Sequence, residues 1–410
     1  MVRDAIAVAA IAVLTVQALR RWCGDRYIVP SNSMQPVLYG DPRYGDIVFV
    51  DKLASAAARR RHDLVVVQHP DPEKPSQQLV KRIAAVGDDQ MACCIDIRGG
   101  DIWLGPDQQH MQRETKDPLE ARSMRVPWAS WPSNQEALLD VRAAVRDGVV
   151  LRIPALDFAA AEARGLFTSK ARSERRLDPA LRVVPTGFLG TAKPVDATYV
   201  DATGTRGLVG EDVGMADCGM DLELLDPVAG LLCSIDSSAE VLTFHWQPAT
   251  GRIELWRNGE TVKSADLPPS ALGVHRIEFG LLDDRAFFVV DGDRDGMFVV
   301  ARRSEWQPER EPRKVPHCYV HLGVVGDQPL RLASLRVFHD VFARREPIVG
   351  MPGLPNDWPK VVKAGTWFLL GDSPFDSRDS RQFGPVPSSS FLGVPRLVLG
   401  PWPRCRWLSS

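Results

Sequence analysis

Short apolar runs alternating with polar positions dominate this 410-residue chain. Leu79, Lys81 and Ile83 share one face of a predicted strand, because side chains alternate between the two faces of a strand. A hairpin is predicted from residues 94–98 and 101–104. From about residue 181, short β runs separated by turn residues predict an antiparallel sandwich. The main runs span residues 222–225, 241–246, 252–256, 275–280, 286–290, 297–300, 318–324 and 332–338.

Near the start of the chain, residues 5–19 form an apolar run that is closed by Arg20 and Arg21. Its fifteen residues would span only about 22 Å as a helix, which is short of a ~30 Å hydrocarbon core. A membrane helix must therefore thin the bilayer, borrow Trp22 and Cys23, or let its arginines snorkel. A cleavable signal peptide is the alternative, but no small-x-small site follows the run. We predict a membrane anchor.

Between the hairpin and the sandwich the pattern weakens. A polar stretch without a sustained period covers residues 106–135, and helical spacing follows at 135–146 and at 159–166. After the sandwich, four prolines between residues 347 and 359 predict a stiff linker.

Composition limits the classes of function. The chain is long enough for two or more domains. Its formal net charge of -2, without a long basic or acidic tail, argues against a general nucleic-acid binder. The seven cysteines show no metal-ligand spacing, and their odd number leaves at least one thiol unpaired within the chain. We therefore predict no nucleic-acid partner and no metal site, and no disulfide framework can be read from the sequence.

Candidate chemistry lies in two distant stretches. Residues 30–36 read Pro-Ser-Asn-Ser-Met-Gln-Pro, and residues 377–381 read Ser-Arg-Asp-Ser-Arg. A serine hydroxyl is a weak nucleophile near neutral pH and needs an adjacent base. A lysine can be that base only where burial and neighbours depress its pKa. The apolar strand face around Lys81 offers such an environment, with Ser377 as a neutral hydrogen-bond partner for the amine.

Each stretch alone has an ordinary structural explanation. Ser-x-Ser before Met is usually a loop, Lys-Arg on a strand is usually a solvated edge, and Asp379 with Arg381 is most often a surface ion pair worth under about 1 kcal/mol. Their joint occurrence favours a serine-lysine peptidase. His62 and His69 are the rival bases, but neither has a triad-like context.

These stretches resemble the sequence boxes of bacterial type I signal peptidases, which remove signal peptides from exported proteins. The P-S-x-S-M-x-P box of that family covers residues 30–36, and its G-D-x-V-x-V strand covers 45–50. The lysine box covers residues 81–84, and the last box covers 371–381. Departures lie at Val37 in place of threonine, at Ala85 and Asp88 in place of glycines, and at Ser373 in place of asparagine. None of them removes a reacting group.

The resemblance implies a role for each matching residue. Ser33 is implied as the nucleophile and Lys81 as the general base. The hydroxyl of Ser31 is implied to help form the oxyanion hole, and Ser377 to orient Lys81. Structural support of the site is implied for four further residues: Asp379 and Arg381 as an ion pair, Met34, and Pro36.

The end of the sandwich segment carries a second resemblance. Residues 275–279, 287–292 and 332–340 resemble, in spacing and strand endings, concanavalin-like jelly-roll domains of the laminin-G type. This implies a glycan or cell-envelope partner, or a purely structural role. Residues 291–296 resemble half of a calcium loop, but Arg302 stands where its last glutamate is expected, so we predict a polar hairpin turn. Trp246 and Trp256 are candidates for stacking on sugars, although their alternating strand positions favour the core.

The predicted fold class is mainly β, with a signal-peptidase-like antiparallel β catalytic core, an N-terminal membrane helix and an inserted β-sandwich. The predicted parts are an anchor (1–24), the first part of the peptidase core (25–105), a linker with short helices (106–180), a jelly-roll insert (181–345), and a Pro-rich return linker with the second part of the core (346–410).

The predicted function is that of a membrane-anchored serine endopeptidase that cuts preproteins after small residues at positions -1 and -3, without a cofactor. Its predicted partners are preproteins and the lipid bilayer. The arginines after the anchor outnumber Arg3 before it, so the positive-inside tendency places the catalytic side in the cytoplasm. The resemblance instead implies a single-pass protein of the bacterial inner membrane with its catalytic domain on the outer face, and we follow it.

Three alternatives stay open. One is a processing peptidase dedicated to a few envelope cargoes, and another is an envelope- or glycan-binding protein with a degenerate peptidase core. The third is a self-cleaving repressor, which uses the same dyad but carries a DNA-binding domain where this chain has a predicted anchor.

Overall fold

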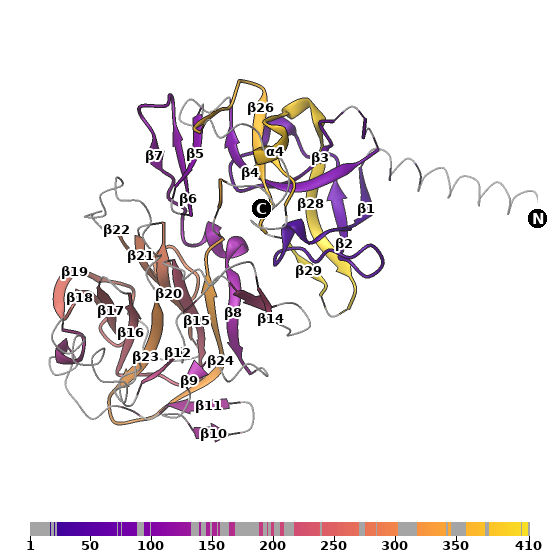
Figure 1. Cartoon of the computed structure of the whole chain (residues 1–410). Coiled ribbons are helices and arrows are strands. Elements are labelled where there is room, and N and C mark those ends of the chain that lie inside the picture. Colours follow the sequence, from indigo (N-terminus) through magenta and orange to yellow (C-terminus); the bar gives the residue numbers. More distant parts are fainter. Residues whose placement is uncertain are drawn as a thin grey trace, which may run out of the picture. The chain divides into compact units, whose positions relative to one another are not determined.

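The computed structural model of the chain consists of two compact units (Figure 1). Unit 1 comprises Met1–Glu114 and Val341–Ser410, and unit 2 comprises Thr115–Asp340, so unit 2 is inserted into the sequence of unit 1. Strands dominate both units, which confirms the mainly β class. The structure describes residues 17, 20, 23–71, 73–74, 76–87, 94–98, 100–132, 139–140, 145–147, 150–153, 155, 164–168, 188–191, 195, 198–200, 206–208, 217–237, 240–269, 275–283, 285–301, 318–341, 343–345, 358–373, 377–402 and 404–408.

Unit 1 is built from two antiparallel sheets. The larger sheet has the order β1-β2-β28-β3-β4-β26-β27, and β29 pairs with β28. In that order its strands span Gly24–Ile28, Ile47–Asp51, Phe391–Gly400, Leu64–Gln68, Gln78–Val86, Thr366–Leu370 and Val386–Pro387, and β29 spans Arg406–Trp407. The smaller sheet has the order β25-β5-β6-β7, with strands Lys360–Val361, Cys94–Arg98, Asp101–Gly105 and Gln112–Arg113. The short helices are η1 (Asn32–Met34), η2 (Ala56–Ala58), α4 (Ser380–Phe383) and η5 (Ser388–Ser390).

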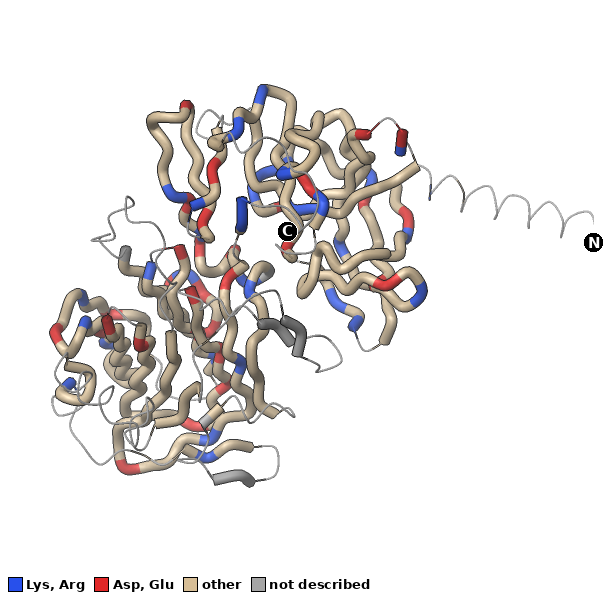
Figure 2. Tube along the Cα trace, viewed as in Figure 1, with Lys and Arg blue, Asp and Glu red and all other residues tan. Residues whose placement is uncertain are grey.

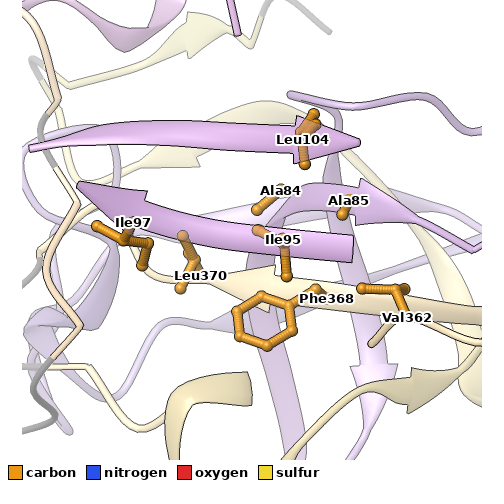
Figure 3. Packing of buried hydrophobic residues seen from close by; sticks show 8 residues of the cluster. All are labelled: Ala84, Ala85, Ile95, Ile97, Leu104, Val362, Phe368 and Leu370. Carbon is orange, nitrogen blue, oxygen red and sulfur yellow. The ribbon is translucent and has the colours of Figure 1, made fainter. Parts of the chain in front are cut away.

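Apolar side chains join the two sheets of unit 1. Figure 3 shows Phe368 of β26 beside Ile95 of β5, with Ala84 and Ala85 of β4 in the same cluster. All four side chains are buried. Because burying apolar surface is the main favourable term in folding, this cluster fixes β4, the strand that carries Lys81. The predicted β5–β6 hairpin is confirmed.

Unit 2 is a sandwich of two antiparallel sheets. One sheet has the order β10-β11-β24-β15-β20-β21-β22, and β8 pairs with β24. Its strands in that order span Val145–Asp147, Val150–Ile153, Leu330–His339, Cys218–Leu224, His275–Leu282, Arg285–Val290 and Met297–Ala301, and β8 spans Val126–Trp131. The other sheet has the order β19-β18-β17-β16-β23-β12-β9, with strands Glu260–Asp266, Arg252–Arg257, Val241–Gln247, Gly230–Asp236, Tyr319–Val325, Leu189–Thr191 and Leu139–Asp140. Unit 2 also contains the pair β13 (Thr198–Val200) and β14 (Arg206–Leu208), and η3 (Glu120–Met124).

Aromatic rings pack between the two sheets of unit 2. The ring of Phe288 in β21 lies 5.7 Å from those of Phe244 and Trp246 in β17. Trp246 and Trp256 are both fully buried, so both belong to the interior, as their alternating positions along the strands predicted. Between β21 and β22 the chain makes the predicted hairpin turn, in which Asp291 accepts from the backbone N–H of Arg276.

Two parts of the sequence differ from expectation. The helix predicted over residues 135–146 is wrong in its described part, where β9 and β10 lie instead, because pairing with neighbouring strands outweighs a weak helical spacing. The supposedly irregular stretch 106–135 contains β8, whose Trp131 pairs with Leu335 of β24. Within the predicted helix 159–166, residues 164–166 are helical.

Two predictions fall largely outside the described residues, namely the membrane anchor and the Pro-rich linker. In the part of the chain that the structure describes, no helix has both the length and the apolar character needed to cross a bilayer.

Candidate active site

Ser33 and Lys81 are in direct hydrogen-bond contact. Ser33 lies in η1, and Lys81 lies in β4, where it pairs with Val65 of β3. Lys81 Nζ lies 2.7 Å from Ser33 Oγ and donates to it. Lys81 is 2% exposed and Ser33 is 8% exposed. A hydroxyl and an amine at this distance, away from bulk water, form the arrangement that a nucleophile and its base require.

The turn that carries Ser33 is anchored on the core of unit 1. Met34 is fully buried in a cluster with Val48 of β2 and Leu64 of β3, and its carbonyl accepts from the N–H of Leu38 at 2.7 Å. Pro36, two residues after Met34, is half-buried. The buried side chain of Met34 therefore fixes the turn that carries Ser33 on the core of unit 1.

Ser31 lies on the exposed side of the same turn. Its Oγ lies 3.4 Å from Ser33 Oγ. This position allows the Ser31 hydroxyl to reach an oxygen atom that develops charge beside the nucleophile.

The C-terminal stretch meets the same turn from the other side. The backbone N–H of Ser373 donates to the carbonyl of Ser33 at 3.1 Å. At Gly371 an added Cβ would lie 2.1 Å from Ser377 Oγ and 2.4 Å from the Ser33 carbonyl oxygen. Only glycine leaves room for this approach of the two chain segments.

Ser377 is fully buried beside Gly371. Its Oγ has no hydrogen-bond partner among the described residues, so the bond to Lys81 that the resemblance implies is not formed in this structure. An unsatisfied buried hydroxyl costs about 1–3 kcal/mol. An unsatisfied buried hydroxyl such as that of Ser377 needs an explanation, and one explanation is that it forms its hydrogen bond during a reaction.

Asp379 and Arg381 form a buried pair behind the site. Arg381 donates through Nε and Nη2 to the two carboxylate oxygens of Asp379, each at 2.8 Å. Asp379 also accepts from the N–H of Gly371 at 3.0 Å and from that of Arg381, which caps α4. Burial alone would raise the pKa of Asp379, but the charge and hydrogen bonds of Arg381 outweigh it, and Lys81 also lowers it. The pKa of Asp379 is therefore held below its usual range.

A second buried ion pair was not predicted from the sequence. Arg82 donates through Nε and Nη2 to the two carboxylate oxygens of Asp372, each at 2.7 Å. These residues directly follow Lys81 and Gly371, so the pair ties the lysine strand to the segment that contacts Ser33. Their place inside the two sequence boxes was the available signal, but a sequence does not show which charges meet.

The rival histidines take part in other contacts. His62 Nε2 lies 3.0 Å from Glu114 Oε1. His69 Nδ1 accepts from the N–H of Asp71 at 3.0 Å, and its ring packs against Phe383. Burial lowers the pKa of His69, with smaller contributions from nearby cations. Both histidines are thus engaged by partners other than Ser33.

Two segments of the chain match the model of a known protein family. The family described as signal peptidase, peptidase S26, matches residues 2–131 and 341–402. The two matched segments contain both halves of the site and leave out most of unit 2. A comparison with curated proteins found no match.

Solved structures similar to the chain include several β-sandwich proteins. A winged bean acidic lectin complexed with methyl-α-D-galactose is 11% identical, with a TM-score of 0.31, over 53% of this chain and 98% of its own. A Bacillus licheniformis β-glucanase is 9% identical, with a TM-score of 0.28, over 53% and 97%. A galectin of Caenorhabditis elegans is 15% identical, with a TM-score of 0.22, over 30% and 83%. At such TM-scores these similarities support no conclusion about what unit 2 binds.

Proposed function

We propose that this chain is a membrane-anchored serine endopeptidase that removes signal peptides from exported preproteins. The contact of 2.7 Å between Lys81 Nζ and Ser33 Oγ carries the proposal. The match of two segments to the signal peptidase family supports the substrate class. By the same likeness, the enzyme cuts after small residues at positions -1 and -3.

In the acylation step Ser33 Oγ attacks the scissile carbonyl carbon while neutral Lys81 takes its proton. The resulting oxyanion accepts hydrogen bonds from the Ser33 N–H and the Ser31 hydroxyl, and each such donor contributes about 3 kcal/mol. Lys81 then passes the proton to the leaving amine as the C–N bond breaks. An ester between Ser33 and the signal peptide remains.

In the deacylation step a water molecule attacks the ester carbonyl. Lys81 takes a proton from this water and returns it to Ser33 Oγ as the C–O bond breaks, so the signal peptide leaves with a free carboxyl group. We assign Ser377 to the orientation of Lys81 during these transfers, since its free hydroxyl lies beside Gly371 in the site.

The proposed membrane partner is supported by one surface of unit 1. We call it the apolar face, and it consists of five exposed side chains from β1, β2, β28, the turn after β28, and β29: Ile28, Phe49, Leu399, Trp402 and Trp407. Trp402 and Trp407 are 85% and 78% exposed, and tryptophan favours membrane interfaces. Ile28 lies at the end of β1, and β1 starts at Gly24, where the predicted anchor ends. This arrangement fits a catalytic unit that rests on the outer face of the bacterial inner membrane.

The decisive experiment is cleavage of a preprotein with an Ala-x-Ala site by the detergent-solubilised protein. We expect the wild type to cut at that site and Ser33→Ala and Lys81→Ala to lose activity by at least about a thousandfold. The proposal would be contradicted if the wild type were inactive, or if Ser33→Ala and Lys81→Ala kept their activity.

The alternatives differ in what they need from the site. A binding protein with a degenerate core does not need the buried Ser33–Lys81 contact. A peptidase dedicated to a few envelope cargoes uses the same chemistry, so only the range of preproteins cut distinguishes it.

Figure 2 shows basic and acidic residues interspersed over the described parts of both units, which fits the proposal that nucleic acid is not a partner. A glycan or envelope partner for unit 2 stays a prediction.

A further inference from the structure

Glu114 is the last residue of unit 1 before the chain enters unit 2. Its backbone N–H donates to the carbonyl of Ile102 in β6 at 2.8 Å. Its carboxylate is buried, and Oε1 accepts from Arg61 Nη1 at 2.8 Å and lies 3.0 Å from His62 Nε2. The end of the first segment of unit 1 is therefore attached to the loop that precedes β3.

His62 links this carboxylate to the lysine strand. Its backbone has a φ of 72°, which is unfavourable for a residue other than glycine, so local contacts must hold it. The N–H of His62 donates to Ile83 at 2.8 Å, and its carbonyl accepts from Arg82 Nη1 at 2.7 Å. Both partners lie in β4 beside Lys81.

Arg82 continues the connection to the nucleophile. The same guanidinium that bonds the His62 carbonyl holds Asp372 through two hydrogen bonds. The next residue, Ser373, donates to the Ser33 carbonyl. An unbroken series of contacts thus runs from Glu114 to Ser33.

The segment of unit 1 that follows the insertion is attached in a similar way. Arg345 donates through Nε and Nη2 to Asp96 at 3.0 and 2.9 Å. The carbonyl of the preceding residue, Arg344, accepts from Arg381 Nη1 at 3.3 Å. Arg381 is the partner of Asp379, which bonds the N–H of Gly371.

We propose that two residues of unit 1 that flank the insertion are positioning residues of the peptidase site: Glu114 acts through His62 and Arg82, and Arg345 acts through Arg344 and Arg381. Neither residue reacts with the substrate. Each holds a segment that fixes Ser33 or Lys81, so each helps to set how often the pair is aligned for reaction. This inference rests on the proposed function.

The first test is a double-mutant cycle on the full chain with the preprotein assay. Glu114→Ala should lower kcat about fivefold with KM unchanged, because alignment and not binding is lost. Glu114→Gln should keep most of the activity, since the amide oxygen still accepts both hydrogen bonds. His62→Gly fits the positive φ at this position and removes the side-chain contact with Glu114, so it should lower kcat by a similar factor. Adding Glu114→Ala to His62→Gly should then lower kcat no further.

The second test compares two arginines that share one carboxylate. Arg345→Gln should lower kcat, whereas Arg98→Gln should not, because Arg98 pairs with Asp96 without leading to Arg381. Thermal unfolding of each variant separates lost alignment from lost folding.

Four results would overturn the inference: unchanged kcat in Glu114→Ala, unchanged kcat in Arg345→Gln, losses in Glu114→Ala and His62→Gly that multiply, or losses explained by a smaller folded fraction. An inactive wild type or an active Lys81→Ala variant would instead remove the proposed function, and the inference with it.

Discussion

Gly371 is the residue on which contact between the two halves of the site depends most directly. Any side chain there would meet Ser377 Oγ and the Ser33 carbonyl at under 2.5 Å. We expect Gly371→Ala to lower cleavage at least about tenfold, because a displacement near 1 Å is enough to misplace a nucleophile. The assay is preprotein cleavage by protein whose folding has been checked by circular dichroism. Gly165→Ala is the control, since nothing lies within 4 Å of a Cβ there. Equal activity in both variants would contradict this account.

Asp379 gives a prediction about pH. Because its pKa is lowered in the folded state, its contribution to the free energy of unfolding is present above the usual pKa of 3.8 and is lost as the pH falls through the folded value. Asp379→Asn leaves the Arg381 charge buried and should cost about 3–5 kcal/mol at pH 7. The difference from wild type should shrink below pH 3.8.

Denaturant unfolding at pH 7 and at lower pH measures this difference. Glu73→Gln is the control, because the Glu73 side chain is exposed on unit 1 and its substitution should change little. A gap between wild type and Asp379→Asn that does not depend on pH would show that the buried charge is not its source.

Individual residues also show what a sequence can reveal. The stretch around Ser33 and the alternation around Lys81 predicted two residues that the structure places in contact. The pairing of Arg82 with Asp372, and the unsatisfied hydroxyl of Ser377, could not be predicted. Both depend on which segments pack together, and local sequence does not encode that.

At the level of strands, the apolar face makes a prediction about membrane contact. Phe49 of β2 pairs with Leu397 of β28, which pairs with Trp407 of β29, so three strands contribute to one surface. Replacing both Trp402 and Trp407 by serine should lower cleavage of a preprotein embedded in vesicles about tenfold, because aromatic interfacial contacts are lost.

Cleavage of a soluble peptide should be unaffected by the same change, since the substitution leaves Ser33 and Lys81 untouched. Val262→Ser, which alters an exposed apolar side chain in unit 2, is the control. An equal loss on both substrates would indicate a structural effect and not membrane contact.

Strands were easier to predict than their partners. The β5–β6 hairpin and most of the sandwich strands follow from alternation and turn residues. The helical spacing over residues 135–146 is wrong at β9 and β10, because short strands derive their stability from pairing with a partner: β9 pairs with the distant β12, and β10 pairs with the adjacent β11. The strand β8 could not be predicted either, because it pairs with β24 near the other end of the unit 2 sequence.

Taken as a whole, the chain has two units that should respond to pH in opposite directions. In unit 2 the amine of Lys116 contacts the carboxylates of Asp283 and Asp340. Burial raises the pKa of Asp340 to about 6 against the attraction of Lys116, and the nearby Asp283 adds to the rise. A raised pKa means that the folded state binds the proton more tightly than the unfolded state does.

The stability that unit 2 gains from this proton is therefore complete below the usual pKa of 3.8 and is lost as the pH rises through about 6. The loss should be on the order of 2–3 kcal/mol between pH 4 and pH 7.5. Asp340→Asn should remove this pH dependence, because one carboxylate then remains for Lys116. Calorimetry at several pH values, with separate transitions for the two units, measures it. If the unit 2 transition keeps its pH dependence in Asp340→Asn, another group is responsible.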